Sequence, residues 1–398
     1  MEHSPARRLT LAAAILTSMV FVAAICIPAT ANLFKINPPV PLQESDPNPM
    51  PVLQSDLATV GQVIYTLRRN WLDRNFGLRK VLVRWQQLLD VRVLGASMPN
   101  DSVLAGDGDW LYLAQENPQL NVVTDYRAVN HLTQAQLATW VTVFTFRRDW
   151  LAAHGIKYMV VVAPNKASIY PEHIPKRFNR ARDVNKMDQL VGVLGGAGVD
   201  IVDLRPALLE AKAQGPAYYR TDSHWTPYGA FFAYQEIMRR LQRYFPDMRP
   251  APLESFLMGR KPGLLGGLSY MIAMGDLYQE DIVLIEPKFQ RNAFEVSGKE
   301  AQLNHFQPLS VYENQDKSLP RALVIRDSFV HEIIPFMAEH FSRMYFVWPF
   351  PTDAVQVRGF DTEAILQEKP DIVIDEFVER YFTQPPPPSA LSSLPRLP

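Results

Sequence analysis

The sequence has little cysteine and lacks the spacing of metal ligands. Its only cysteine among 398 residues is Cys26, which lies in an apolar N-terminal run. The rest of the chain therefore has no disulfide and no thiolate metal site. Eight histidines are present, but none stands in an H-E-x-x-H pattern or a comparable ligand spacing. We therefore expect no zinc site, and no motif indicates another metal or a cofactor.

An excess of charge of one sign and internal repeats are also missing. The 40 Lys and Arg residues nearly balance the 41 Asp and Glu residues, so the formal net charge is -1. A charge so close to zero gives no overall attraction to nucleic acid, and we expect no nucleic-acid partner. The hydrophobic content of 47% and the charged content of 20% are those of an ordinary globular protein.

The N-terminus has the pattern of an export signal. Arg7 and Arg8 precede Leu9–Ile27, a run without charged residues that spans roughly 28 Å as a helix, about the thickness of the bilayer hydrocarbon. The basic flank predicts a cytoplasmic N-terminus, and Ala29-Thr30-Ala31 fits a signal-peptidase site. Residues 1–31 are therefore interpreted as a signal peptide or a membrane anchor, and the remainder of the chain as exported.

Proline density and hydrophobic periodicity divide the rest of the chain. Proline-rich residues 32–56 read as an extended linker and residues 383–398 as a tail. Residues 57–99 form a mainly helical N-terminal region, because apolar side chains recur at helical spacing there. Residues 100–382 form the main domain, with an insertion at about 246–320 that is rich in Gly, Pro and short apolar runs and is expected to contain β-structure.

Strands and helices alternate through the main domain. Two short strands around a Gly-Asp turn are expected within Val103–Leu113. Further strands are expected at Lys157–Ala163, Val199–Val202, Ala322–Ile325, Arg343–Val347 and Asp371–Ile374, and helices at Thr133–His154, Asn185–Leu194, Tyr228–Tyr244, Val330–Phe341 and Thr362–Gln367. This alternation predicts an α/β fold with a parallel sheet covered by helices on both faces.

Two short strings carry the chemistry. Residues 220–225 read Arg-Thr-Asp-Ser-His-Trp, and residues 324–329 read Val-Ile-Arg-Asp-Ser-Phe at the end of an apolar run. They supply a hydroxyl (Ser328), an imidazole (His224) and a carboxylate (Asp222), the groups that serine acyl transfer needs. Ser328 would sit at the carboxyl end of a strand, where open α/β sheets bind ligands.

Local geometry adds to this hypothesis. In an extended segment Asp222 and His224 would project to the same side. The N–H groups of Ser328 and Phe329, at a helix start, are candidates to face a developing oxyanion. The structural alternative is a polar loop that precedes a helix capped by Thr226.

The strings also resemble a known family, the SGNH-hydrolase-like O-acetyltransferases of bacterial exopolysaccharide assembly, which includes the periplasmic alginate O-acetyltransferases. The similar stretches are Asp107–Tyr112, Val162–Pro171, Thr221–Ala230, Asp327–Phe329 and Glu379-Arg380. The resemblance covers about residues 100–382. It implies an SGNH-hydrolase-like three-layer fold in which Ser328 is the nucleophile, His224 the general base and Asp222 the group that orients the base. Arg326 departs from the family's usual glycine.

The resemblance implies a periplasmic O-acetyltransferase that acts on an exported polysaccharide through an acetyl-serine intermediate. A multi-pass membrane acyltransferase would be the acetyl donor, and other exopolysaccharide assembly proteins would be partners. An acetylesterase with the same triad remains an alternative, because sequence does not separate water from a sugar hydroxyl as acceptor. A non-catalytic polysaccharide-binding assembly subunit is the second alternative.

Other polar residues near these strings have plainer interpretations. Lys166 is expected to be a solvated loop lysine, with a side chain that faces the site as the alternative. His331 is expected to lie on a helix surface. Glu379-Arg380 is expected to form an ion pair. Trp225 and Tyr228 are equally consistent with a sugar subsite and with core packing.

Overall fold

The structure is a computed structural model that describes residues 5–34, 36, 40, 76–117, 120–296, 310–348, 360–383, 385 and 391. The chain divides into two units, residues 1–100 with 269–277 and residues 101–268 with 278–398. The predicted linker and tail fall almost entirely outside the described residues, as does the first part of the predicted helical region, residues 57–75.

Within its described residues, the first unit contains two long helical segments. They are α1 (Pro5–Leu33) and α4 (Arg79–Leu88), and α4 continues into a π-helical turn, Leu89–Val93. Among the helices of the described residues, none combines the length and the apolar character that crossing a membrane requires. Arg84 contacts both carboxylate oxygens of Asp276 at 2.7 Å and donates to the Ala273 carbonyl at 2.7 Å, which ties α4 to residues 273–276 within this unit.

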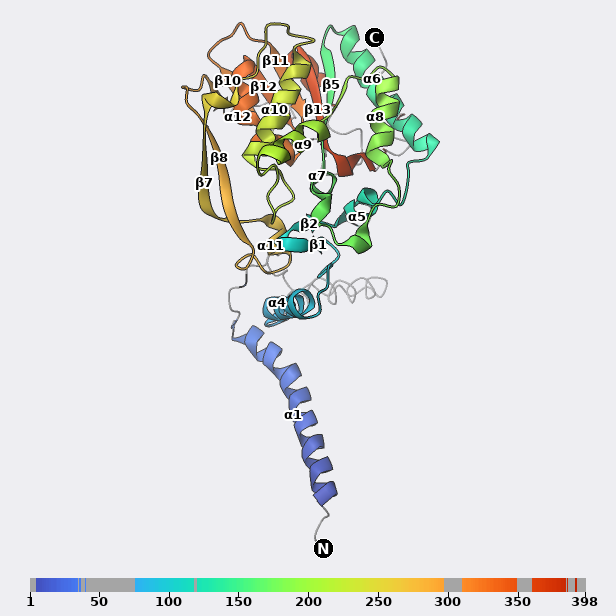
Figure 1. The fold of residues 1–398 in the computed structure, drawn as a ribbon, viewed down its shortest axis with the longest axis vertical. Coiled ribbons are helices and arrows are strands. Elements are labelled where there is room, and N and C mark those ends of the chain that lie inside the picture. The colour runs from blue at the N-terminus through green and yellow to red at the C-terminus, as the bar shows by residue number, and fades with distance from the viewer. Residues whose placement is uncertain are drawn as a thin grey trace, which may run out of the picture. The chain divides into compact units, whose positions relative to one another are not determined.

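The second unit is built on a seven-stranded sheet in the order β6-β5-β13-β11-β12-β10-β9 (Figure 1). The first five strands are parallel neighbours, and β10 and β9 extend the sheet in antiparallel pairing. The strands are β1 (Val103–Ala105), β2 (Leu111–Leu113), β3 (Gln115–Asn117), β4 (Leu120–Asn121), β5 (Lys157–Ala163), β6 (Ile201–Asp203), β7 (Phe256–Leu265), β8 (Gln279–Pro287), β9 (Ala293–Val296), β10 (Ser310–Asn314), β11 (Arg321–Ile325), β12 (Arg343–Val347) and β13 (Ile372–Val378).

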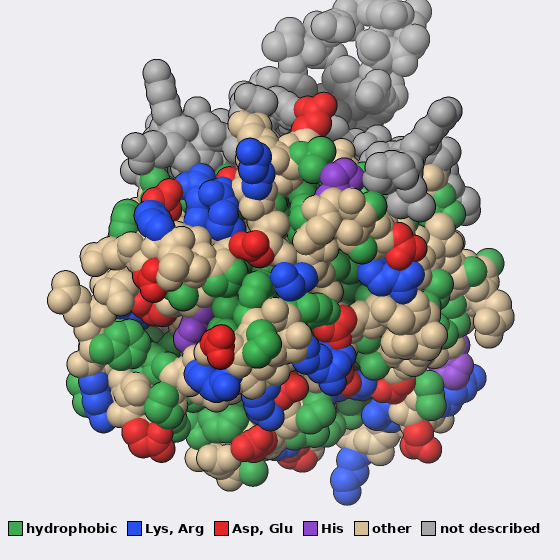
Figure 2. Space-filling view, turned by 90° about the horizontal axis from the view of Figure 1, so that it is seen from above, with side chains coloured by type: hydrophobic (Ala, Val, Ile, Leu, Met, Phe, Trp, Pro, Cys, Tyr) green, Lys and Arg blue, Asp and Glu red, His purple; other side chains and the backbone are tan. Residues whose placement is uncertain are grey.

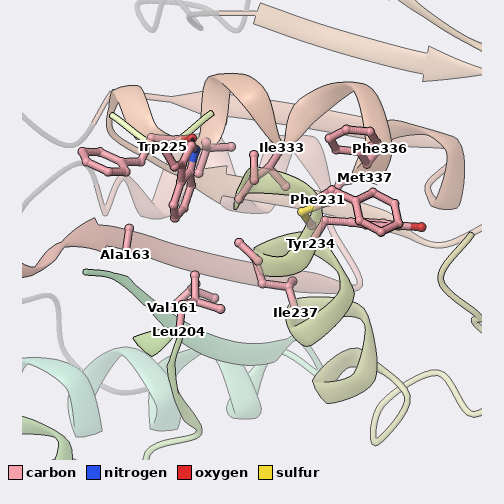
Figure 3. Packing of buried hydrophobic residues seen from close by; sticks show 14 of the residues in the cluster. Val161, Ala163, Leu204, Trp225, Phe231, Tyr234, Ile237, Ile333, Phe336 and Met337 are labelled. Carbon is pink, nitrogen blue, oxygen red and sulfur yellow. Dashed lines mark hydrogen bonds between the residues drawn. The ribbon is translucent and has the colours of Figure 1, made fainter. Parts of the chain in front are cut away.

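Helices cover both faces of this sheet, as predicted. The α-helices are α5 (Val122–Tyr126), α6 (Gln134–Ala153), α7 (Lys166–Ile169), α8 (Lys186–Gly196), α9 (Arg205–Gln214), α10 (Pro227–Leu241), α11 (Gly267–Met271), α12 (Ile334–Met337) and α13 (Thr362–Glu368). Side chains of α9, α10 and α12 belong to one core cluster with Met159 and Val161 of β5, and those of α6, α8 and α13 belong to another with Tyr158 and Val160 of β5. Figure 3 shows part of the first core, between β5 and α10.

Most predicted elements are confirmed, and capping explains their ends. Thr133 forms a capping box with Gln136 at the start of α6, and Gly155, with φ +73°, follows its end. The strand predicted at 371–374 continues to Val378, because its carboxylates at 375 and 376 are buried within the sheet rather than solvated at its end.

One predicted helix is wrong in form. Residues 330–341 do not make a continuous α-helix. A 3-10 turn, Ser328–Glu332, is followed by α12 and by a second 3-10 turn, Ala338–His340. Pro335 lies in the first turn of α12 and has no N–H to extend a helix that begins at Ser328, so the segment starts afresh there.

The predicted insertion does contain β-structure. Strands β7 and β8 form a long antiparallel ribbon with a register shift between Lys261 and Leu264, and β9 and β10 join the edge of the main sheet. Figure 2 shows one face of the molecule, on which Lys and Arg side chains are interspersed with Asp and Glu. This mixture agrees with the net charge of -1.

Candidate active site

A narrow loop before α10 carries Asp222 and His224. Tyr218 and Trp225 close the loop through a β-bridge, and Thr226 caps α10 by accepting the Gly229 N–H at 3.1 Å. The segment bends rather than extends, contrary to the expectation from side-chain alternation. The Asp222 Oδ1 atom accepts the His224 backbone N–H at 3.0 Å, a turn that aspartate makes with the residue two positions on.

Ser328 lies at the carboxyl end of β11, as expected. The Asp327 side chain caps the 3-10 turn that begins at Ser328: its Oδ1 accepts the Phe329 N–H at 2.9 Å and its Oδ2 accepts the Val378 N–H at 2.7 Å. Glu376 accepts the Asp327 N–H at 3.1 Å. These bonds fix the backbone on which the half-buried serine is presented.

The two segments bring the three predicted residues together. His224 Nε2 lies 2.8 Å from Ser328 Oγ, and His224 Nδ1 lies 2.7 Å from Asp222 Oδ1. The Gly267 N–H donates to the other Asp222 oxygen at 2.7 Å. Hydroxyl, imidazole and carboxylate therefore form one continuous hydrogen-bonded chain, the arrangement that activates a serine nucleophile.

The environment of Asp222 fixes how the imidazole is protonated. Burial alone would raise the pKa of Asp222, but its hydrogen bonds and charge interaction with His224, together with the Gly267 N–H, hold that pKa well below the usual range. Asp222 is therefore ionised at neutral pH and can only accept hydrogen bonds. Consequently Nδ1 of His224 carries the hydrogen and Nε2 is free to accept the proton of Ser328.

The neighbours of His224 and Ser328 in the sequence also bind each other. Trp225 donates its Nε1–H to the Phe329 carbonyl at 3.0 Å, and the two rings pack edge-on with centroids 5.0 Å apart. Trp225 is fully buried and Tyr228 is nearly so. Both side chains therefore belong to the core rather than to a sugar subsite.

Lys166 corrects the expectation of a solvated lysine. Its side chain is buried, and its Nζ donates to the carbonyls of Tyr219 and Arg220 at 3.0 Å and of Asp222 at 2.5 Å. Burial lowers the pKa of Lys166 to about 7, although the charges of Asp222 and Glu280 oppose this shift. The contact of Lys166 with these carbonyl groups was not predicted, because the residues next to Lys166 in sequence give no sign that it is buried.

Several other expected contacts differ from those in the structure. The Phe329 N–H is taken by Asp327 and does not face a developing oxyanion, whereas among the described residues no acceptor takes the Ser328 N–H. Glu379 and Arg380 do not pair with each other: Glu379 accepts from residues 165, 168 and 185, and Arg380 pairs with a glutamate at 116. His331 is exposed, as expected.

A cavity lies beside the segment that carries Asp222 and His224. It has a volume of about 440 Å³ and is lined by Tyr219, Arg220 and Thr226 of that segment, together with Trp110, Tyr170 and Asp281. Asp222, His224 and Ser328 are not among its lining residues. Within the described residues, no cluster of three or more His, Cys, Asp or Glu side chains is arranged to hold a metal ion.

Sequence comparison identifies relatives of part of the chain. Residues 103–267 match the family described as the SGNH hydrolase-like domain of the acetyltransferase AlgX. The probable alginate O-acetylase AlgJ of Pseudomonas syringae pv. tomato is 29% identical over 165 residues, which cover 42% of this chain and 39% of that protein. AlgJ of Pseudomonas aeruginosa, described in the same words, is 25% identical over 232 residues, which cover 58% of this chain and 54% of that protein.

Solved structures share the fold. Bacillus cereus PatB1 with a sulfonyl adduct matches with a TM-score of 0.51 at 16% identity, over 71% of this chain and 95% of that chain. A DHHW family protein from Eubacterium siraeum matches with a TM-score of 0.50 at 13% identity, over 74% of this chain and 96% of that chain.

These matches bear on the predictions in two ways. They confirm the resemblance predicted from the motifs and the SGNH-hydrolase-like α/β fold. The chain spans between about two fifths and about half of the length of the two AlgJ proteins. Asp222 and His224 lie inside the matched family segment, whereas Ser328 follows it.

Proposed function

We propose that the chain is an O-acetyltransferase that moves acetyl groups to hydroxyls of an exported polysaccharide through an acetyl-Ser328 intermediate. The observation that carries the proposal is the hydrogen-bonded chain from Asp222 through His224 to Ser328. The relatives support the choice of acetyl transfer, because the two AlgJ proteins are described as probable alginate O-acetylases. The acceptor polysaccharide of this chain is inferred from that likeness.

In the first half of the reaction, Ser328 Oγ attacks the carbonyl carbon of an acetyl donor while His224 Nε2 takes the serine proton. The tetrahedral intermediate collapses as the donor's oxygen or sulfur leaves, and the imidazolium returns the proton to that leaving group. Asp222 remains ionised throughout and stabilises the imidazolium through Nδ1. The Ser328 N–H is the donor available to the oxyanion.

In the second half, a sugar hydroxyl attacks the acetyl carbonyl of Ser328. His224 Nε2 takes the hydroxyl proton and then gives it to Ser328 Oγ as the serine leaves, so the enzyme returns to its starting state. An esterase would use the same steps with water in place of the sugar. The cavity lined in part by Tyr219, Arg220 and Thr226 offers aromatic and charged side chains to a glycan.

The proposal includes a location and partners. The N-terminal segment would direct the domain out of the cytoplasm to the periplasm. Acetyl groups would then have to arrive from the cytoplasm through a multi-pass membrane acyltransferase, and other exopolysaccharide assembly proteins would present the polymer.

The test is capture of the covalent intermediate. The enzyme is mixed with 4-nitrophenyl acetate, quenched within seconds and weighed intact. We expect a burst of nitrophenolate and one added acetyl group, mapped by peptide analysis to Ser328, which the Ser328→Ala variant lacks. Faster discharge by a polysaccharide than by water supports the transferase, and discharge by water alone makes the chain an esterase. A folded wild-type enzyme without burst or adduct would leave a binding subunit as the function.

A further inference from the structure

Two charged side chains hold the loop that presents the triad's carboxylate. We call residues 219–222 the triad loop. Lys166 approaches it from α7, which follows β5, and Glu280 approaches it from β8 in the inserted ribbon. The two residues are 114 positions apart in sequence. Both are buried or nearly so, since Lys166 is 4% exposed and the Glu280 side chain is 9% exposed.

Lys166 donates hydrogen bonds to the carbonyl groups of the triad loop. Its ammonium has three N–H donors, and three carbonyl oxygens lie within hydrogen-bonding distance, those of Tyr219, Arg220 and Asp222. The donor count of a protonated lysine is therefore matched by its acceptors. The rings of Trp110 and Tyr112, with centroids 5.7 and 5.1 Å from Nζ, cover the same group.

Glu280 accepts hydrogen bonds from backbone N–H groups of the same loop. Its Oε2 accepts the Arg220 N–H at 2.8 Å, and its Oε1 accepts the N–H and the hydroxyl of Thr221 at 2.7 and 2.6 Å. The cation thus binds carbonyl oxygens and the anion binds N–H groups on one short stretch of backbone. Each interaction is a charge-assisted hydrogen bond, stronger than a neutral one.

The inserted segment also approaches the loop through glycine. A Cβ atom at Gly266 would lie 2.2 Å from the Thr221 carbonyl oxygen, so only glycine fits there. The next residue, Gly267, donates its N–H to Asp222. The insertion therefore reaches the triad loop at its backbone and at its carboxylate.

We propose that Lys166 and Glu280 are positioning residues for acetyl transfer, because they fix the backbone from which Asp222 reaches His224. This inference rests on the proposed function. Neither residue touches the reacting atoms. They keep the Asp222 carboxylate hydrogen-bonded to the His224 imidazole. Loss of either residue therefore lowers the rate of acylation more than it weakens substrate binding.

Two variants with matched controls test the proposal. Lys166→Met removes the ammonium at similar length, and Lys186→Met removes another mostly buried lysine, which pairs with a carboxylate away from the loop. Glu280→Gln keeps the shape of the side chain, and Glu286→Gln changes an exposed position on the same strand. We expect acylation by 4-nitrophenyl acetate to slow about 10- to 100-fold in the first and third variants, with KM changed less than threefold, and to stay within twofold in the controls.

Two further readouts separate positioning from general damage. The Nδ1–H proton resonance of His224 reports its bond to Asp222, and we expect it to shift or broaden in Lys166→Met and Glu280→Gln but not in the controls. In the wild type, acylation should decline above about pH 7 as Lys166 becomes neutral and keeps only two N–H donors. Asp222, Glu280, Tyr112 and Arg380 are the other ionisable groups around it. In Lys166→Met this decline should disappear.

Each outcome is decisive. If the wild type shows no burst, the proposed function fails before the variants are compared. If the wild type shows the burst and both variants acylate within threefold of it with an unchanged Nδ1–H resonance, the positioning role is wrong. If Lys166→Met does not fold, Glu280→Gln decides alone, because it is isosteric and its side chain already touches solvent.

Discussion

Replacing Asp222 by Asn tests whether His224 needs an ionised hydrogen-bond partner or only a polar one. The carboxylate accepts three N–H groups: Oδ1 takes the backbone N–H and Nδ1 of His224, and Oδ2 takes the Gly267 N–H. An asparagine side chain has one acceptor oxygen and one donor nitrogen in their place. Either orientation of the amide therefore sets a donor against a donor.

The two orientations bracket the expected loss. If the amide oxygen keeps both bonds to His224, its NH₂ faces the Gly267 N–H and one hydrogen bond to a charged group is lost, about 1.5–3 kcal/mol or roughly 10- to 160-fold in rate. If the amide turns over, its NH₂ donates to Nδ1, the ring carries its hydrogen on Nε2, and Ser328 has no base. In a serine protease with this change, the loss is about 10⁴-fold.

The assay is the rate constant of the acylation burst with 4-nitrophenyl acetate. We expect Asp222→Asn to fall between 10- and 10⁴-fold below the wild type while keeping its melting temperature within a few degrees. Asp247→Asn, an exposed aspartate, is the matched control and should be unchanged. An Asp222→Asn enzyme within threefold of the wild type would show that the carboxylate does not orient the base.

Three shorter predictions follow from other parts of the chain. His224→Ala should reduce acylation at least as much as Asp222→Asn, and His331→Ala should leave it nearly unchanged; the reverse order would mean that the wrong base was chosen. A periplasm-only reporter fused after residue 45 should be active, and a stable but inactive cytoplasmic fusion would contradict export. Arg147→Met should lower the free energy of unfolding by about 3–5 kcal/mol, because it leaves the buried carboxylate of Asp375 without its cation. Denaturant titration measures this loss, and the double variant with Asp375→Leu should recover most of it.

Local sequence predicted the parts of the fold that depend on local physics. Strands β5 and β12 have the bounds predicted from their apolar runs, and α6 and α8 begin after the residues whose side chains cap them. The contact among Asp222, His224 and Ser328 was implied by the family resemblance, whereas residue types and the position of Ser328 after a strand left a polar loop as the alternative. The strand bounds and the helix caps need no knowledge of distant contacts, whereas the contact between His224 and Ser328 joins residues 104 positions apart.

Two of the missed features, the burial of Lys166 and the contact of Glu280 with the triad loop, depend on distant contacts. Lys166 is buried only because the carbonyls of a loop more than fifty positions away converge on it, and nothing in its own neighbourhood signals this. Glu280 lies in an insertion whose position over the triad loop has no sequence pattern. Helix α9 (Arg205–Gln214) was not predicted, because its polar residues and Pro206 resemble a loop, although Pro in the first turn is common in helices.

The bond between Trp225 and Phe329 makes the distance from base to nucleophile independent of the length of chain between them. Those two residues adjoin His224 and Ser328, and their edge-on packing belongs to the same core as β11 and α10. The whole inserted ribbon lies between them in sequence. That ribbon can therefore lengthen, shorten or be exchanged for one with another shape without separating His224 from Ser328, provided that its contacts to the triad loop are kept. The spacing of His224 and Ser328 is therefore set by the core next to them and not by the size of the inserted ribbon.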